Sequence, residues 1–439
     1  MSNIYLETYG CSANQNNGEI MKGLLERQGF IVTSNEKIAD IAILNTCIVK
    51  GPTEQRMTLR IKELSKKFKK LIVAGCMADV ESLKIKVEAR KSNPKILLSL
   101  VGVHNITKIV DVVKKLIENK TVELISRGEE VKLCMPKSSV NKAIGITQIS
   151  SGCTGSCAYC ITKLVKGHLF SYPKEKIIDN IKQDLTSGCK EIWLTSQDNA
   201  AYGIDRGKYE FPELLNKIST IKGKFFIRIG MMNPNHVMKI IDSLIENYND
   251  KKIFKFLHLP IQSGSDDVLK NMNREYKVKD FADIVKKFRK KFPNVTISTD
   301  IIVGFPGETR DDFNKTLRLI KEIRPNIINI SKFWPMPHTQ AAKMKQVDLK
   351  EKKKRAIALM KLHNEIALEK NDKLIGNIIK AIVDEHGFQN TWLARDENYK
   401  LIAFKSNENL LGKIVSLKII KARGHYLIGE MIKIDKAER

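Results

Sequence analysis

Three cysteines stand within eight residues in the stretch SSGCTGSCAYCITK, which runs from Ser150 to Lys163. Cys153, Cys157 and Cys160 have the spacing C-x3-C-x2-C and follow an apolar run that is expected to be a strand. A zinc ion takes four protein ligands, or three with an open catalytic position, whereas iron–sulfur clusters are held by cysteine thiolates. No suitably spaced fourth ligand lies nearby. The three thiols could hold zinc or an iron–sulfur cluster, and with three protein ligands one iron of a [4Fe–4S] cluster would remain open to a small molecule.

Three further cysteines are far apart in the sequence but share one kind of position. Cys11 follows the run IYLETYG, Cys47 follows IAILNT, and Cys76 follows LIVAG, and each run has the character of a strand. Because the carboxyl ends of parallel strands meet at one edge of a sheet, the three thiols are expected to converge there. A single buried cysteine is commonly a packing residue, but three coincident placements favour a second three-cysteine cluster. Cys134 and Cys189 lack such a position, and we assign them no role.

Polar side chains also stand at the ends of several strand-like runs in the middle of the chain. Parallel α/β folds bind ligands at the carboxyl ends of their strands, so this position marks candidate ligand-binding residues. Hydrogen bonding within the fold is the alternative, and the sequence leaves both open. His258 lies in one of these runs and is expected to pack. The candidates are Gln197, Asp198, Arg228, Gln262 and Asp300.

The elements that must position these residues alternate between strands and helices, which predicts an α/β fold class. The first part of the chain predicts a parallel α/β domain, and six further strands alternating with helices predict a partial (β/α)6 barrel, although an open doubly wound sheet also fits. After a charged helix, short strands with glycine turns predict a small β-barrel. The expected divisions are an N-terminal cluster domain at 1–125, a linker at 126–142, the barrel domain at 143–343, a connecting helix at 344–372 and the C-terminal barrel at 373–436.

Composition limits the partners of the protein. The chain carries 76 Lys and Arg residues against 49 Asp and Glu, a formal net charge of +27. Such an excess favours nucleic acid as a partner, although a solvated lysine-rich surface gives the same count. No apolar run is long enough to span a membrane and the N-terminus has no signal-peptide pattern, so a cytoplasmic protein is expected.

The predicted C-terminal barrel combines basic and aromatic side chains. This combination suits RNA through phosphate attraction and base stacking, although barrel aromatics can equally form a core. The basic residues are Lys413, Lys418, Lys421, Arg423 and Lys433, and the aromatic residues are Trp392, Tyr399, Phe404 and Tyr426.

Taken together, the two triads and the C-terminal barrel resemble the methylthiotransferase family of radical S-adenosylmethionine enzymes over essentially the full length. The matching stretches are ETYGCSANQNNGEIM, NTCIVKGPTEQR, AGCMA, SSGCTGSCAYCITK and GHLFSYP. Within the family the chain is most similar to the archaeal and eukaryotic type that acts on threonylcarbamoyladenosine in tRNA. The other branches usually open the cysteine motif with Glu-Gly-Cys, where this chain has Ser-Gly-Cys. One departure is the pair Lys166-Gly167 in place of the usual Arg-Gly, which keeps the charge but removes a bidentate contact.

The resemblance implies two [4Fe–4S] clusters and S-adenosylmethionine as cofactors. The open iron of the central cluster would bind the cofactor, and one-electron reduction would yield a 5′-deoxyadenosyl radical. This radical would abstract hydrogen from C2 of N6-threonylcarbamoyladenosine at position 37 of tRNA. The open iron of the N-terminal cluster would deliver sulfur, and a methyl group from S-adenosylmethionine would complete the methylthio group. Tyr159 would pack near the cofactor's adenine, and the polar strand-end residues above would contact the cofactor.

The resemblance also implies partners. These are the tRNA anticodon stem-loop, a one-electron reductant such as a ferredoxin or flavodoxin, and a sulfur donor, with no membrane. Two other hypotheses stay open at this point. The substrate could be an isopentenyladenosine tRNA or a ribosomal protein, or the chain could be a non-catalytic RNA-binding protein that contains zinc.

Overall fold

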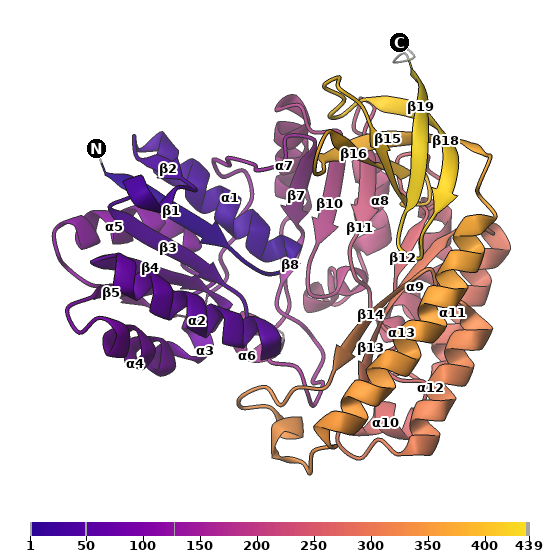
Figure 1. Ribbon diagram of the computed structural model, residues 1–439, viewed down its shortest axis with the longest axis horizontal. Coiled ribbons are helices and arrows are strands. Elements are labelled where there is room, and N and C mark those ends of the chain that lie inside the picture. The colour runs from indigo at the N-terminus through magenta and orange to yellow at the C-terminus, as the bar shows by residue number, and fades with distance from the viewer. Residues whose placement is uncertain (1, 49–50, 127, 436–439) are drawn as a thin grey trace.

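The computed structural model describes residues 2–48, 51–126 and 128–435. Figure 1 shows an N-terminal α/β part, a central strand–helix part and a C-terminal barrel at the yellow end of the colour bar. Residues 1, 49–50, 127 and 436–439 lie outside the described residues, and so do the portions of the expected ranges that fall on them, including the final residue of 373–436.

The N-terminal part is a parallel sheet with the strand order β2-β1-β3-β4-β5-β6. The runs expected to precede Cys11, Cys47 and Cys76 are its neighbouring strands β1, β3 and β4. The strands are β1 (Asn3–Thr8), β2 (Ile31–Thr33), β3 (Ile41–Thr46), β4 (Lys70–Gly75), β5 (Leu97–Val101) and β6 (Glu123–Leu124). The helices are α1 (Ser12–Arg27), α2 (Gly51–Lys67), α3 (Cys76–Val80), α4 (Ser82–Ser92) and α5 (Ile109–Ile117), with short 3-10 turns at Glu36–Ile38 and Ile106–Lys108.

Helices cover both faces of this sheet because alternate strand residues point to opposite sides. On β3, Ala42 and Leu44 pack with α2 and α4, whereas Ile41 and Ile43 pack with α1 and α5. All four side chains are buried, so the strand reads as a continuous apolar run rather than as an alternating one. The carboxyl edge of the strands is the part of the sheet left for a site.

The central part is a curved parallel sheet of two three-stranded segments, β11-β10-β7 and β12-β13-β14. A parallel bridge between Ile227 and Ile253 joins β11 to the stretch just before β12, so the strands follow the partial-barrel order predicted from the sequence. The strands are β7 (Ile144–Gln148), β10 (Glu191–Thr195), β11 (Phe226–Ile229), β12 (Phe256–His258), β13 (Thr296–Val303) and β14 (Ile327–Lys332).

One large apolar core lies between these strands and the helices outside them. Cys189 is part of this core, in agreement with a packing role. The helices are α7 (Lys174–Thr186), α8 (Phe211–Ser219), α9 (Pro234–Asn247), α10 (Asp266–Asn271), α11 (Val278–Lys291) and α12 (Arg310–Ile323). A short ribbon of β8 (Ser150–Ser151) and β9 (Phe170–Ser171) and a short helix, α6 (Thr162–Lys166), flank the cysteine loop, and 3-10 turns lie at Asn199–Ala201, Ile204–Arg206 and Gln340–Lys343.

The connecting helix α13 (Leu349–Asp372) begins five residues later than the expected residue 344. The Asp348 carboxylate accepts hydrogen bonds from the backbone N–H groups of Lys350 (2.7 Å) and Glu351 (3.4 Å), which fixes the first turn at this point. Figure 1 shows α13 crossing diagonally from the central part toward the C-terminal barrel. Among the described residues, none of the helices combines the length and apolarity that a membrane span requires.

The C-terminal part is the predicted small barrel, closed in the order β15-β16-β17-β19-β18. Its strands are β15 (Ile378–His386), β16 (Thr391–Asp396), β17 (Leu401–Lys405), β18 (Ile414–Ala422) and β19 (Leu427–Ile434). Trp392 and Phe404 are paired across β16 and β17 and are buried in the barrel core. Tyr399 is buried against the central part. Of the four aromatic residues considered for RNA stacking, only Tyr426 is exposed: strand alternation points Trp392 and Phe404 inward, and Tyr399 packs from the turn between β16 and β17 against the central part.

Candidate active site

The three N-terminal cysteines lie at the carboxyl ends of adjacent strands. Cys11 precedes α1, Cys47 follows β3, and Cys76 is the first residue of α3 after β4. Gly10 has a φ of +116°, and a Cβ at this position would lie 2.7 Å from the Cys47 Cβ. Only glycine permits both this backbone conformation and this approach, so Gly10 lets the end of β1 close onto Cys47.

Buried hydrogen bonds tie these strand ends together. Asn14 Nδ2 donates to the Thr46 carbonyl (3.2 Å), and Asn45 Nδ2 donates to the Asn14 carbonyl (2.9 Å). The Thr46 hydroxyl donates to the Ala74 carbonyl (2.6 Å) and accepts from the Met77 N–H (3.2 Å). Each bond joins residues beside two different cysteines. The network therefore fixes the three thiols relative to one another.

The loop with the three central cysteines starts at the β8–β9 ribbon. Gly152 follows β8 with a φ of +80°, and a Cβ there would lie 1.7 Å from the carbonyl oxygen of His168. The N–H of Cys153 donates to the Gly167 carbonyl (3.3 Å). The two sides of the loop can therefore meet only if glycine stands before the first cysteine.

Arg274, from the turn between α10 and α11, contacts the cysteine loop. Its Nη1 donates to Cys157 Sγ (3.1 Å), Nη2 donates to Asn233 Oδ1 (2.6 Å), and Nε donates to Tyr276 Oη (2.8 Å). Hydrogen bonds to ligand sulfurs are one of the means by which a protein orients and tunes an iron–sulfur cluster. Arg274 is therefore placed to act on a cluster through Cys157.

Asp198 supports the same loop from behind the site. Its carboxylate accepts from Asn233 Nδ2 (2.7 Å) and the Asn233 N–H (3.1 Å), and it lies 3.8 Å from His236 Nε2. His236 Nε2 is 3.0 Å from Thr154 Oγ1 in the cysteine loop. Burial raises the pKa of Asp198, and His236 and Asn233 oppose this rise. Asp198 therefore positions Asn233 and His236, which lie between it and the cavity.

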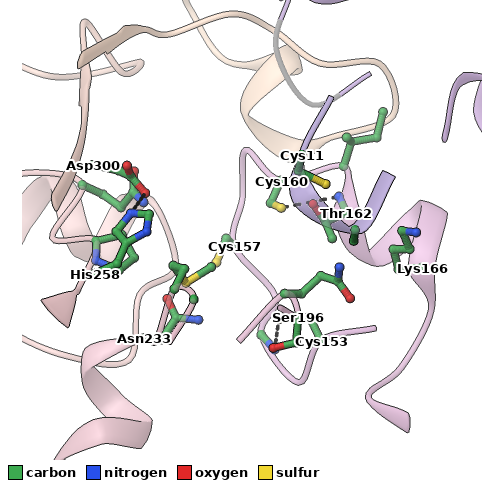
Figure 2. A pocket seen from close by; sticks show the side chains of 18 of the residues that line it. Cys11, Cys153, Cys157, Cys160, Thr162, Lys166, Ser196, Asn233, His258 and Asp300 are labelled. Carbon is green, nitrogen blue, oxygen red and sulfur yellow. Dashed lines mark hydrogen bonds and ion pairs between the residues drawn. The ribbon is translucent and has the colours of Figure 1, made fainter. Parts of the chain in front are cut away.

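Helix α6, which begins two residues after Cys160, brings the two triads to one cavity. It contacts α3, the helix that begins with Cys76, and Val165 joins the apolar core of the N-terminal sheet. The cavity has a volume of about 440 Å³, within the ~300–1,000 Å³ typical of small-molecule sites. Figure 2 shows the three central cysteines and Cys11 around it, and Cys76 also lines it. Cys47 is buried and is not part of the cavity wall, so the whole central triad and two of the three N-terminal cysteines open onto the same space.

Five of the six residues predicted to contact the cofactor line this cavity, and Asp198 is the exception. The buried Gln197 Oε1 has no hydrogen-bond partner among the described residues, as expected of an atom kept for a ligand. Tyr159 packs edge-on against Phe305, with ring centroids 6.3 Å apart. Gln262 has a φ of +71°, and its backbone hydrogen-bonds across to β13.

Arg228 reaches the cavity from β11 and is surrounded by aromatic rings. Its guanidinium lies 5.0 Å from the Trp193 ring centroid, 5.3 Å from that of Phe256 and 5.5 Å from that of Tyr399. Tyr399 belongs to the C-terminal barrel. These cation–π contacts hold the charge in place and couple the barrel to the cavity.

The remaining predicted residue, Asp300, lies on the same wall as His258. Asp300 Oδ2 is 3.2 Å from His258 Nε2, and Asp300 Oδ1 accepts from Asn329 Nδ2 (2.7 Å). The ring of His258 lines the cavity, as Figure 2 shows, so His258 joins the candidate site residues, and its expected packing role stays a prediction. His258 is the last residue of β12, whereas Asp300, predicted from a strand-end position, lies within β13 (Thr296–Val303).

Burial raises the pKa of three of the six site thiols, which favours their protonated form in the absence of a cation. It raises the pKa of Cys76 and of Cys153 to about 12, and neighbouring thiols add to the rise. Burial also raises the pKa of Cys160. Bound metal reverses this preference because the thiolate is the ligand form. Desolvated thiols around one cavity are therefore a donor set that fits iron–sulfur clusters.

In the described part of the chain, no three His, Cys, Asp or Glu side chains surround a position for a single metal ion. A four-iron cluster takes each thiolate on a different iron, so its ligands stand around the cluster and not around one ion. The assignment of the six cysteines as cluster ligands stays a prediction from their positions.

Comparison with known proteins identifies the family. Three family models match: the Radical SAM superfamily over residues 147–320, Uncharacterized protein family UPF0004 over residues 3–96, and the TRAM domain over residues 372–432. A probable threonylcarbamoyladenosine tRNA methylthiotransferase of Pyrococcus horikoshii is 39% identical over 448 residues, which cover 98% of this chain and 100% of that protein. The chain belongs to the threonylcarbamoyladenosine tRNA methylthiotransferase family.

Members of this family also occur in eukaryotes. The threonylcarbamoyladenosine tRNA methylthiotransferase of Homo sapiens is 35% identical over 442 residues, which cover 99% of this chain and 74% of that protein. Among solved structures, the radical S-adenosylmethionine methyltransferase TsrM from Kitasatospora setae matches with a TM-score of 0.56 at 9% identity, over 78% of this chain and 77% of that one. This likeness shows a shared fold. The predicted family and fold class are thereby confirmed.

Proposed function

We propose that this chain is a tRNA methylthiotransferase that attaches a methylthio group to C2 of N6-threonylcarbamoyladenosine at position 37. The cavity lined by the central triad together with Cys11 and Cys76 of the N-terminal triad carries this proposal. Radical generation and sulfur supply are separate tasks, and both must reach the same carbon. An arrangement with two thiol triads on one cavity meets this requirement.

S-adenosylmethionine and two [4Fe–4S] clusters, when bound, supply the one-electron chemistry, the sulfur and the methyl group that an unactivated aromatic carbon requires. The protein's own residues position these groups and exclude water. The central triad, in which Cys157 accepts a hydrogen bond from Arg274, is the proposed site for the cluster that binds S-adenosylmethionine. The N-terminal triad is proposed to hold the sulfur-bearing cluster. The proposed ligands are Cys153, Cys157 and Cys160 for the first and Cys11, Cys47 and Cys76 for the second.

Polar and aromatic wall residues are proposed to bind the remainder of the cofactor and the substrate base. Tyr159 offers a ring face beside the central triad, and Gln197 offers an unused carbonyl oxygen. Arg228 near the end of β11, Gln262 beyond β12 and Asp300 within β13 line the same cavity, where they can reach the polar groups of a nucleoside.

The partner is tRNA. The net charge of +27 supports binding of a polyanion, and we propose that the anticodon stem-loop is the part that enters the cavity. The chemistry further requires a one-electron reductant, for which a ferredoxin or flavodoxin is proposed, and a donor of reduced sulfur. A cytoplasmic location is proposed because that is where such a tRNA substrate is found.

Mass spectrometry of tRNA nucleosides tests the function. Cells that lack the gene should lose 2-methylthio-N6-threonylcarbamoyladenosine and accumulate N6-threonylcarbamoyladenosine. Restoring the wild-type gene should restore the product, and restoring a Cys157→Ala gene should not. Unchanged product in the deletion strain would reject the substrate assignment, and loss of a methylthio isopentenyladenosine instead would move the chain to the other tRNA substrate.

A further inference from the structure

Lys166 is a buried lysine whose charge has no partner in the described part of the protein. It is the last residue of α6 and lines the cavity between the triads, yet only 6% of the residue is exposed. Its ammonium has no hydrogen bond or ion pair with another described residue, and its Nζ is not one of the fully enclosed polar atoms, so the ammonium faces the cavity. An ammonium removed from water is costly unless an anion or an acceptor compensates it. The position therefore calls for a ligand of negative charge.

A second buried lysine nearby shows what compensation by the protein looks like. Lys132 donates to the Val103 carbonyl and lies 3.5 Å from the carboxylate of Glu130. Burial, together with Lys132 and Lys166, lowers the pKa of His104 to about 4, so this histidine supplies no charge. Glu130 is thus engaged with Lys132, and the ammonium of Lys166 is left for the cavity.

The surroundings of Lys166 place it beside the N-terminal triad. Burial raises the pKa of Cys76, and the positive charge of Lys166 is the largest of the influences that lower it. Val165, next to Lys166, packs into the N-terminal core, and α6 contacts α3. The central triad has its own cation, because Arg274 donates to Cys157. The two basic groups therefore serve opposite sides of the cavity.

The reaction indicates which anion belongs on the N-terminal side. The methylthio product contains a sulfur atom that the threonylcarbamoyladenosine substrate lacks, so reduced sulfur must enter this cavity. Hydrosulfide and methanethiolate are small anions that fit a cavity of about 440 Å³, whose wall holds apolar side chains such as Ile48 and Ala13 as well as polar ones. A phosphate of the tRNA would have to leave water to reach this place, whereas a sulfur anion bound at a metal is already desolvated.

We propose that Lys166 binds the reduced sulfur anion, hydrosulfide or methanethiolate, beside the N-terminal triad. This inference rests on the proposed methylthio transfer. Lys166 acts as a positioning residue: its ammonium holds the anion where the N-terminal cluster is expected and keeps it facing the cavity.

The test is an anaerobic titration of the cluster-loaded enzyme with sodium hydrosulfide, and separately with sodium methanethiolate, without tRNA. Electron paramagnetic resonance of the reduced clusters reports the bound anion and gives an apparent Kd for each. Lys166→Met and Lys166→Gln should weaken binding about tenfold or more, and Lys166→Arg should bind within about threefold of wild type. The matched control is Lys163→Met, which removes the same charge from the same helix outside the cavity wall.

Each outcome decides the proposal. Wild-type affinity in both neutral variants, or an equal loss in Lys163→Met, would overturn it. Loss of the N-terminal cluster from both neutral variants, measured as iron and sulfide, would also overturn it, because Lys166 would then be needed to hold the cluster and not the sulfur anion. Weaker tRNA binding with unchanged sulfur affinity would assign Lys166 to phosphate instead. Because the titration contains no tRNA, the sulfur site can fail while the nucleoside assay still supports the function.

Discussion

Gly152 is the point at which the cysteine loop is most sensitive to a single substitution. In Gly152→Ala the new methyl group would stand 1.7 Å from the carbonyl oxygen of His168, and the φ of +80° would disfavour any side chain. The backbone conformation costs about 1–2 kcal/mol. Relief of the overlap must separate β8 from β9, which removes about two ribbon hydrogen bonds at about 1 kcal/mol each. The local cost is thus about 3–4 kcal/mol.

A protein stable by about 5–15 kcal/mol survives such a loss, so Gly152→Ala is expected to fold with a displaced cysteine loop. The melting temperature should fall by about 3–4 °C, and anaerobic reconstitution should yield about four irons per chain where two clusters would give about eight. S-adenosylmethionine cleavage should be lost. Iron, sulfide and 5′-deoxyadenosine are the quantities to measure.

Gly167→Ala is the matched control for this experiment. Gly167 belongs to the same loop and has a similar φ of +75°, but a Cβ there meets nothing within 4 Å. The Gly167→Ala protein should lose only about 1–2 kcal/mol of folding stability, the cost of the backbone conformation, and should keep both clusters. A Gly152→Ala protein that holds about eight irons and melts with wild type would refute the steric argument.

The remaining predictions concern the division of labour and the pH dependence. Cys157→Ala should abolish S-adenosylmethionine cleavage, whereas Cys47→Ala should leave cleavage intact and block thiolation. Chromatography of 5′-deoxyadenosine measures cleavage, and chromatography of tRNA nucleosides measures thiolation. Loss of both activities in a folded Cys47→Ala protein would contradict this division of labour. Burial raises the pKa of Glu191 from 4.5 to about 7, and the nearby Asp384 adds to the rise. Because the folded state favours protonated Glu191, stability should fall as pH rises from about 4.5 to about 7. Glu191→Gln should flatten that fall and raise the melting temperature at about pH 8, and an unchanged melting profile would argue against the burial effect.

The positions of the cysteines could be predicted from the sequence because strand ends are marked by local patterns. Three apolar runs followed by Cys11, Cys47 and Cys76 predict that these cysteines lie at one edge of a sheet. In the structure β1, β3 and β4 are parallel neighbours, so the cysteines after them do lie at one edge. The partial barrel and the small C-terminal barrel follow from the same kind of periodicity.

Other parts of the site depend on contacts between distant segments, which periodicity does not encode. Arg274 comes from a turn between two helices, and no strand end marks it. The meeting of the triads depends on α6 packing against α3, a contact between two short helices from different parts of the chain. The buried aromatics Trp392 and Phe404 looked suited to RNA because composition alone does not show which face of a strand is inside.

The central claim is that two sets of three thiolates hold two iron–sulfur clusters at one cavity. Anaerobic purification followed by iron, sulfide and zinc analysis of wild type, Cys157→Ala and Cys47→Ala tests it most directly. Wild type should contain about eight irons and eight sulfides, either variant about four of each, and none of the three proteins should contain zinc. Zinc in place of iron, or a cysteine variant that retains about eight irons, would contradict it.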